Sequence, residues 1–472
     1  MLAYFWAWSD KGDGVQGGPF YTALYKNAFS PSLWVLGIAG LLLVLSLLVR
    51  RPFCDALCPI GATSDLASRL LRRHFSGPVS DAAPVSLVRR RQFLERSAAG
   101  AGAVLLGGEA LSEFALGAAE PALGVGFRND APDALGDVAR PAAFASHEGD
   151  TVRCQLCPHE CILGENDRGF CRTRVVKGGK LHTLAYGNLC SEHLDPMEKK
   201  PLYHFLPSTP IVSVAMGGCN LRCLNCQNWE ISQARPNEVA TQTLLPAALA
   251  RETREQGAIA VAYTYSEPLM AYEYVRDSAA VAREQGLKNV LVTAGYINER
   301  PLRELCRVID AVTLDVKAFR EAFYREVSGA RLAPVLRTLE VLREEGVWTE
   351  VSFLMVPSLS DDPQEIGDFA AWVAKHLGTG TPLHILRFHP AHRLKHLPPT
   401  PVAAMEQAHR RARDAGLDYV YLGNVPGHDS NHTRCPKDGR ILIERHGFEV
   451  RDNRLIDGRC PCGERIPGVF SV

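Results

Sequence analysis

The sequence predicts an α/β protein built on a partial (βα)6-type barrel, and three observations support this prediction. From residue 205 onward, short β-branched runs alternate with amphipathic helical stretches, a rhythm typical of parallel strands joined by right-handed crossovers. Most of the helical stretches end at a glycine, which readily adopts the left-handed conformation that closes a helix. Polar or charged residues follow several of the strands, and the site of such a barrel lies at those strand ends.

Seven runs are the expected strands: 211–216, 259–264, 289–293, 311–316, 349–356, 383–389 and 419–422. The helices between them are expected to close at Gly257, Gly286, Gly346, Gly378 and Gly416. Six or seven units are too few for a complete eight-fold barrel, so a partial barrel is expected over residues 205–425.

Bulk composition narrows the class of protein. The chain has 472 residues, a length that suits two or three domains. Its formal net charge is zero and no basic stripe is interleaved with aromatic residues, so nucleic-acid binding is not expected. Its 14 cysteines are mostly clustered at spacings of two or three residues, a pattern typical of metal or cluster ligands rather than of disulfides.

The first 118 residues are expected to form a membrane anchor and leader region. Residues 28–49 carry no charge and are long enough to span a bilayer as a helix. The Arg-rich segment after them predicts a cytoplasmic location for the catalytic part, by the positive-inside rule. The stretch around Arg90 and Arg91 resembles a twin-arginine signal, which leaves export as the alternative.

Two further features belong to this front part of the chain. The segment around Cys54 and Cys58 resembles the CxxxCP segment of membrane-bound polyferredoxins over about twelve residues. Residues 119–149 are rich in Ala, Gly, Pro and Asp, which predicts a linker.

A cysteine-rich loop follows the first expected strand of the barrel. Cys219, Cys223 and Cys226 have the spacing C-x3-C-x2-C, and two glycines precede them. Thiolates are the preferred ligands of iron–sulfur clusters. Three thiolates on a four-iron cluster leave one iron open, which marks a reactive site by the logic of catalytic metals. The alternative is a zinc site with a distant fourth ligand.

With this loop the chain resembles the radical S-adenosylmethionine (SAM) superfamily, whose members split SAM reductively at a [4Fe–4S] cluster. Residues 150–472 resemble more specifically the radical SAM component of the AmmeMemoRadiSam system, which is related to the activases of glycyl-radical enzymes. The resemblance is carried by eight ordered segments at 154–161, 195–207, 219–233, 262–268, 291–297, 314–319, 387–390 and 419–427.

The resemblance implies which residues bind SAM. Glu267 and the adjacent Ser266 match the segment that contacts the methionyl amine in the activases. Asp315 and Lys317 match an Asp-x-Lys that binds SAM, with a local ion pair as the alternative. His389 matches a ribose contact. The acidic ribose ligand of the relatives corresponds here to Val292, so Thr293 or a neighbouring backbone group is expected to serve instead.

Two more cysteine groups flank the barrel. Cys154, Cys157, Cys161 and Cys171 supply four thiolates within residues 150–204. These complete a tetrahedral shell, so a structural zinc or an auxiliary iron–sulfur cluster is expected. Residues 426–472 resemble a zinc ribbon that has lost one cysteine. Its ligands are Cys435, Cys460 and Cys462, with Asp438 or His432 as a fourth, and metal occupancy stays open.

The leading hypothesis is therefore a radical SAM enzyme that makes a 5′-deoxyadenosyl radical for hydrogen abstraction. Its partners are SAM, a low-potential electron donor and, by resemblance, Memo-like and AMMECR1-like proteins. One alternative is a glycyl-radical-enzyme activase. Another is a membrane-tethered iron–sulfur electron-transfer module without chemistry of its own.

Overall fold

The computed structural model describes residues 126–471, which lie within one compact unit spanning residues 117–472. The expected membrane helix at 28–49, the Cys54–Cys58 segment and the twin-arginine-like stretch fall outside the described residues. Between residues 126 and 471, no helix has both the length and the apolar character needed to cross a membrane.

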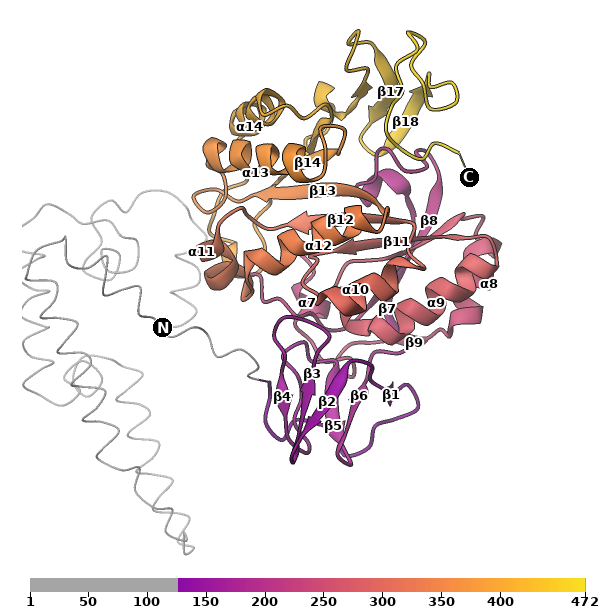
Figure 1. Cartoon of the computed structure of the whole chain (residues 1–472), viewed down its shortest axis with the longest axis vertical. Helices are drawn as coiled ribbons and strands as arrows, with labels where there is room; N and C mark the ends of the chain where they lie inside the picture. Colours follow the sequence, from indigo (N-terminus) through magenta and orange to yellow (C-terminus); the bar gives the residue numbers. More distant parts are fainter. Residues whose placement is uncertain (1–125, 472) are drawn as a thin grey trace, which may run out of the picture. The chain divides into compact units, whose positions relative to one another are not determined.

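A nine-stranded, mostly parallel sheet forms the centre of the unit (Figure 1). Its strand order is β15-β14-β13-β12-β11-β10-β8-β7-β9, so the parallel strands follow chain order and the sheet stays open. The parallel strands are β8 (Pro210–Met216), β10 (Ala260–Tyr263), β11 (Lys288–Thr293), β12 (Ala311–Val316), β13 (Trp348–Met355), β14 (Leu383–Arg387) and β15 (Val420–Gly423). Each of the seven expected strands is present, which confirms the α/β class with a mostly parallel sheet.

Six helices connect these parallel strands: α8 (Pro246–Glu255), α9 (Tyr272–Glu284), α10 (Glu299–Cys306), α12 (Leu332–Glu344), α13 (Pro363–His376) and α14 (Val402–Asp414). The five expected closing glycines all have positive φ, from 71° to 106°. A side chain is strained there, so glycine is the natural terminator. Helix α10 is the exception, because it ends at Cys306 without a glycine.

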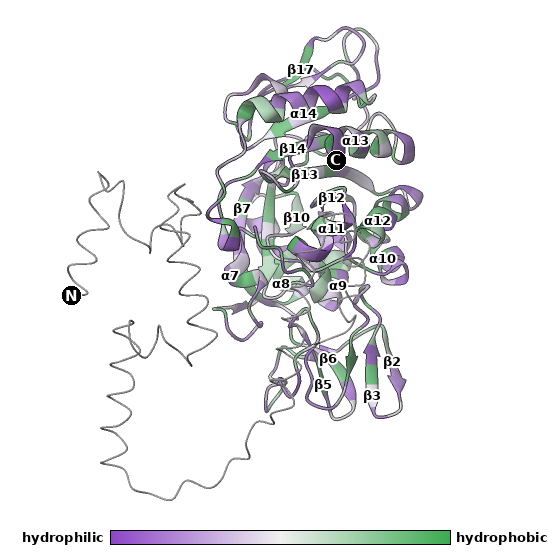
Figure 2. Cartoon of the chain, turned by 90° about the vertical axis from the view of Figure 1, so that its left-hand side faces the viewer, coloured by the Kyte–Doolittle hydropathy of each residue, from purple (hydrophilic) through white to green (hydrophobic). Residues whose placement is uncertain are grey.

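The core lies on both faces of the sheet, as a parallel arrangement requires. Val212, Val261, Val312 and Val351 are fully buried and belong to one large apolar cluster that also includes the inner faces of the helices. Burying each side chain of this kind contributes about 1.5–3 kcal/mol. Hydropathy colouring shows apolar residues concentrated in the strands and polar ones on the outer helical faces (Figure 2).

A cysteine-rich module precedes the main sheet in the chain. It contains two antiparallel three-stranded sheets. One is β1 (Arg140–Pro141), β6 (Lys180–Thr183) and β5 (Arg174–Lys177); the other is β2 (Ala145–Glu148), β3 (Thr151–Cys154) and β4 (Ile162–Leu163). Strands β1 and β2 lie inside the range expected to be a linker, because pairing with β6 and β3 orders that segment.

The boundary between module and barrel also differs from the expected one. Strand β7 (Asn188–Pro196) falls in the range assigned to the module, yet it pairs antiparallel with β8 and with β9 (Gln242–Thr243). The main sheet therefore recruits a strand that the βα rhythm did not reveal, since an antiparallel edge strand needs no crossover helix.

The tail forms a third antiparallel sheet of β16 (Thr433–Arg434), β17 (Ile441–His446) and β18 (Glu449–Asn453). Its apolar side packs on Tyr203, Tyr419 and Tyr421. A parallel bridge between Phe205 and Val469 fastens the end of the tail to the segment that precedes β8.

Candidate active site

The loop after β8 begins with a glycine that no other residue can replace without displacing its neighbours. Gly218 has φ 103°, and a Cβ there would lie 2.5 Å from Thr173 Cγ2 and 2.7 Å from the Cys171 carbonyl oxygen. Both contacts are shorter than real Cβ contacts. The loop therefore lies directly against the cysteine-rich module.

The three cysteines of this loop are held at a defined place. Backbone hydrogen bonds from Arg222 N to Ser328 O (2.8 Å) and from Leu224 N to Val327 O (3.0 Å) tie the loop to the segment after β12. Cys223 is buried, whereas Cys219 and Cys226 are half-buried. The loop thus presents thiols in a partly enclosed position.

The surroundings of the sulfurs suit thiolate ligands of an iron–sulfur cluster. Leu221 N donates to Cys219 Sγ over 3.3 Å, and Ser232 Oγ lies 3.2 Å from Cys226 Sγ. Burial and the negative charges of Glu267 and the other loop cysteines hold the pKa of Cys219 well above its ordinary value. A bound metal would favour the thiolate form of Cys219, because it supplies positive charge next to the sulfur.

The SAM-binding residues expected from β10 and β11 meet each other. Glu267 is buried, and its carboxylate accepts hydrogen bonds from Thr293 Oγ1 (2.6 Å) and from the Ala294 amide (2.9 Å). Thr293 Oγ1 also accepts from Gly295 N over 2.9 Å. Ser266 Oγ donates to the Met216 carbonyl oxygen over 2.6 Å, next to the cluster loop. These side chains brace the loops at this edge of the sheet.

At the end of β12, Asp315 and Lys317 form an ion pair with 2.5 Å between Oδ2 and Nζ. Ser352 Oγ donates to the other carboxylate oxygen over 3.2 Å. Burial raises the pKa of Cys223, and the nearby charge of Lys317 works against that rise. The ion pair therefore faces the same loop as the cysteines.

His389 lies just after β14 and is exposed. Its position is just beyond the carboxyl end of a parallel strand. The same holds, at or beyond their own strand ends, for Glu267, Thr293 and Asp315. The structure thus brings the expected residues to one edge of the sheet, as parallel strands dictate.

Sequence reasoning missed several residues of this region. Asn220 is fully buried; its Nδ2 donates to Tyr296 O (2.7 Å) and its carbonyl accepts from His159 Nε2 (2.8 Å). Tyr265, with φ 64°, donates to Asp195 Oδ2 over 2.5 Å. The 195–207 segment stood out in the sequence, but its contact with Tyr265 depends on the fold.

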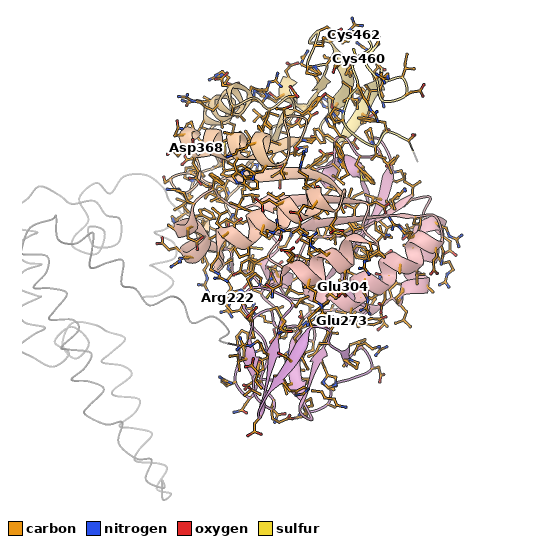
Figure 3. All side chains as sticks on the ribbon, viewed as in Figure 1. Arg222, Glu273, Glu304, Asp368, Cys460 and Cys462 are labelled. Atoms are coloured by element: carbon orange, nitrogen blue, oxygen red, sulfur yellow. The ribbon has the colours of Figure 1, made fainter. Side chains whose placement is uncertain are left out.

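The other two cysteine groups are each brought together. Cys154, Cys157, Cys161 and Cys171 are buried and line one cavity. In the tail, the ligand atoms of Cys435, Asp438, Cys460 and Cys462 all lie within 4.8 Å of one another. His432 is not in this set; its Nδ1 accepts from Arg445 N. Figure 3 shows Cys460 and Cys462 in the tail, and Arg222 and Glu273 where the main sheet meets the cysteine-rich module.

Comparison with known proteins shows which family shares this architecture. Residues 213–373 match the model of the radical SAM superfamily, and residues 32–78 match a 4Fe-4S binding domain. An uncharacterized protein of Methanocaldococcus jannaschii is 43% identical over 331 residues, which cover 69% of this chain and 98% of that protein. The pyruvate formate-lyase 1-activating enzyme of Escherichia coli is 24% identical over 36% of this chain and 71% of its own length.

Solved structures were compared as well. A radical SAM methyltransferase from Sphaerobacter thermophilus aligns with a TM-score of 0.38 and 12% identity, over 61% of this chain and 78% of that one. SuiB of Streptococcus suis bound to SAM aligns with a TM-score of 0.36 and 12% identity, over 48% and 53% of the two chains.

An open, mostly parallel βα sheet with a three-cysteine loop after its first parallel strand defines the class: an α/β enzyme that carries an iron–sulfur cluster at its strand ends. The chain belongs to the radical SAM superfamily. It is an enzyme that cleaves SAM reductively at a [4Fe–4S] cluster and forms a 5′-deoxyadenosyl radical. The 32–78 match also confirms the ferredoxin-like resemblance near the N-terminus.

Residues of the chain itself hold the cluster and order the loops around it. Cys219, Cys223 and Cys226 are the residues that would hold the cluster, which would supply the electron and an open iron for SAM. The buried Glu267 carboxylate orders the turn beside Cys219 through its bonds to Thr293 and Ala294. The loop and its neighbours thereby hold the site in place before SAM arrives.

Proposed function

We propose that this enzyme uses its 5′-deoxyadenosyl radical to abstract hydrogen within an AmmeMemoRadiSam-type system, with Memo-like and AMMECR1-like proteins as partners. The observation that carries the proposal is the ordered set of segments over residues 150–472, which includes the cluster loop. A protein that is 43% identical over 331 residues and is covered over 98% of its length supports treating this part of the chain as one shared unit.

In this proposal Asp315 and Lys317 bind the charged methionyl end of SAM. The carboxylate and the ammonium already lie beside the cysteine loop, and a zwitterionic ligand offers both charges a partner. His389, exposed beyond β14, contacts the ribose. Glu267, Ser266 and Thr293 act by supporting the pocket through the hydrogen bonds that they make with one another and with the strand ends.

The second candidate is an activase that installs a glycyl radical on a partner protein. Similarity to pyruvate formate-lyase-activating enzymes over much of their length favours it. The two candidates differ in the fate of the radical. A stable glycyl radical on a co-encoded partner, detected by electron paramagnetic resonance (EPR), would decide for the activase. The non-catalytic alternative is set aside, because the chain is a SAM-cleaving enzyme.

The location of the catalytic part belongs to the proposal too. We infer a membrane tether at residues 28–49 and a cytoplasmic catalytic part, supported by the uncharged run and the Arg-rich segment after it. A reporter that is active only outside the cytoplasm, fused after the last residue, should stay silent. Reporter activity that disappears when Arg90 and Arg91 become Lys would establish export instead.

The central experiment is anaerobic reconstitution of the full chain with iron and sulfide, followed by reduction with SAM. The intact protein should release 5′-deoxyadenosine, measured by chromatography. Cys219→Ala, Cys223→Ala and Cys226→Ala should each abolish its release, because a methyl group cannot bind iron. Cell extract that contains the Memo-like and AMMECR1-like partners is then added. SAM cleavage should become coupled to the consumption of a substrate present in that extract. Unchanged cleavage in all three variants would refute the role of the loop.

A further inference from the structure

We infer that Cys154, Cys157, Cys161 and Cys171 hold an auxiliary [4Fe–4S] cluster that passes electrons to the SAM-binding cluster. The four thiols come from one module and line one cavity, together with Arg174, Phe170 and Met270. Each of the four cysteines is at most 7% exposed. Four buried thiols around one cavity form a ligand set that is complete in itself.

The donor set suits an iron–sulfur cluster. Thiolates are the preferred ligands of such clusters, and a four-iron cluster binds four of them, one on each iron. The four cysteines supply that number around one cavity. Tetrahedral zinc takes the same number of thiolates, so the metal analysis described below distinguishes the two.

The polar surroundings fit a buried anionic cluster. Arg174 Nη1 lies 3.7 Å from Cys154 Sγ, and its side chain is 1% exposed. Phe170 N donates to Cys161 Sγ over 3.5 Å. The buried Nε of Arg174, which lines the cavity, has no hydrogen-bond partner in the described part of the chain. A buried donor of this kind marks a missing acceptor.

The module touches the SAM site where electron transfer would require it. The Cys171 carbonyl oxygen and the Thr173 side chain abut Gly218, the residue bonded to Cys219. The His159 ring donates to the Asn220 carbonyl on the other side of Cys219. The module therefore contacts the cluster loop on both sides of Cys219.

The role of the auxiliary cluster follows from its four cysteine ligands. Four thiolates leave no iron open for substrate, so the cluster serves as an electron carrier. A low-potential donor of the flavodoxin or ferredoxin class gives one electron to the auxiliary cluster. The auxiliary cluster then gives that electron to the SAM-binding cluster and returns to its oxidised state. The electron is consumed when the C5′–S bond of SAM breaks, which yields methionine and the 5′-deoxyadenosyl radical.

The first test measures the metal without touching the module. The full chain carrying Cys54→Ser, Cys58→Ser, Cys219→Ser, Cys223→Ser and Cys226→Ser is reconstituted anaerobically. It should retain about four irons and four sulfides per chain, and the EPR signal of the reduced protein should not change when SAM is added. Zinc in place of iron would overturn the proposal.

A second set of variants locates that iron. Adding Cys157→Ala and Cys161→Ala to the same protein should remove the iron, whereas adding Cys190→Ser and Cys306→Ser should leave it. Iron that persists after the first pair is changed would place the cluster elsewhere and overturn the assignment. These measurements do not depend on SAM cleavage, so they fail or succeed independently of the proposed function.

The relay is tested with the otherwise unaltered chain. In Cys157→Ala, 5′-deoxyadenosine formation driven by reduced flavodoxin should fall at least about tenfold, while formation driven by the small reductant titanium(III) citrate should stay within about twofold. The split between the two reductants separates electron delivery from misfolding, which would lower both. Equal loss with both reductants, or no loss with either, would overturn the relay.

Discussion

At the scale of single residues, the Asp315 carboxylate has two side-chain partners. Lys317 Nζ pairs with one oxygen and Ser352 donates to the other. The pair lies at the end of β12, on the same side of the sheet as the cysteine loop. These two contacts therefore fix the orientation of the Asp315 carboxylate at this strand end.

Changing Asp315 to Asn should weaken SAM binding by about tenfold or more, because a charge-assisted hydrogen bond contributes about 1.5–3 kcal/mol. The iron content should not change, since the cluster ligands are on a different loop. Equilibrium binding of SAM and iron analysis check both points. Asp368→Asn, on the outer face of α13, is the matched control. Unaltered SAM affinity would reduce the Asp315–Lys317 pair to a structural contact.

Arg174 and Glu273 form another pair, buried between the cysteine-rich module and helix α9. Their Nη2 and Oε1 atoms are 2.6 Å apart, and their side chains are 1% and 5% exposed. The same carboxylate oxygen accepts from the Ala143 amide over 2.7 Å. One carboxylate thus fastens two segments of the module to the barrel.

Replacing Glu273 by Gln should lower the free energy of unfolding by about 3–5 kcal/mol, because it leaves a buried guanidinium without its counter-charge. Denaturant unfolding under anaerobic conditions measures this. Glu304→Gln removes a surface pair with Arg300, whose side chain is 81% exposed, and should cost at most about 1 kcal/mol. Equal effects of the two variants would contradict the structural role of the buried pair.

At the scale of elements, the tail is a small sheet with a compact ligand set at its loops. Cys435 Sγ and Cys462 Sγ are 3.6 Å apart, and Cys460 Sγ is 3.9 Å from Asp438 Oδ2. These separations suit one tetrahedral ion. Asp438 stands where a ribbon would have a cysteine, and the fold places its carboxylate among the thiols.

We expect the tail to bind about one zinc per chain, because its three thiolates and one carboxylate complete a tetrahedral shell. Cys460→Ser should lower zinc content and expose the tail to limited proteolysis, while SAM-cluster iron stays unchanged. Elemental analysis and digestion patterns check this. Asp438→Cys should tighten zinc binding, since it restores a four-thiolate set. A zinc content that does not respond to either variant would exclude the site.

At the scale of the whole molecule, His204 joins the segment before β8, strand β15 and the tail. Its Nδ1–H donates to Pro467 O over 2.7 Å, and its Nε2 accepts from Tyr421 OH over 2.6 Å. These two bonds suit the neutral ring, in which Nδ1 carries the proton and Nε2 is an acceptor. Burial lowers the pKa of His204 to about 4.

This histidine should make the protein less stable in mild acid. The unfolded chain takes up a proton at His204 below a pKa of about 6.5, whereas the folded chain resists until pH about 4. The free energy of unfolding should therefore fall as the pH drops from about 6.5 toward 4, by at most about 1.4 kcal/mol per pH unit. Urea unfolding of the intact chain and of His204→Gln at several pH values tests this. The variant should show the smaller pH dependence, and an identical dependence would assign it to other groups.

Several parts of the molecule follow from local sequence alone. The seven parallel strands and five closing glycines are encoded by short-range patterns, because hydrophobic period and φ preference act within a few residues. The cluster loop is equally local, since its three cysteines lie within eight residues. Strands β1, β2 and β7 were not predicted, because they are ordered by pairing with strands that lie outside their own segments.

The sequence by itself determined the class of enzyme and predicted the loop that binds its cluster, because three thiols at that spacing after a strand are typical of a [4Fe–4S] cluster with one open iron. Only the tertiary structure decided which groups meet. It paired Thr293 with Glu267, placed Asp438 rather than His432 among the tail cysteines, and set Cys171 and Thr173 against Gly218. Those contacts join residues far apart in the chain. No local pattern encodes them, because they arise from the packing of whole elements.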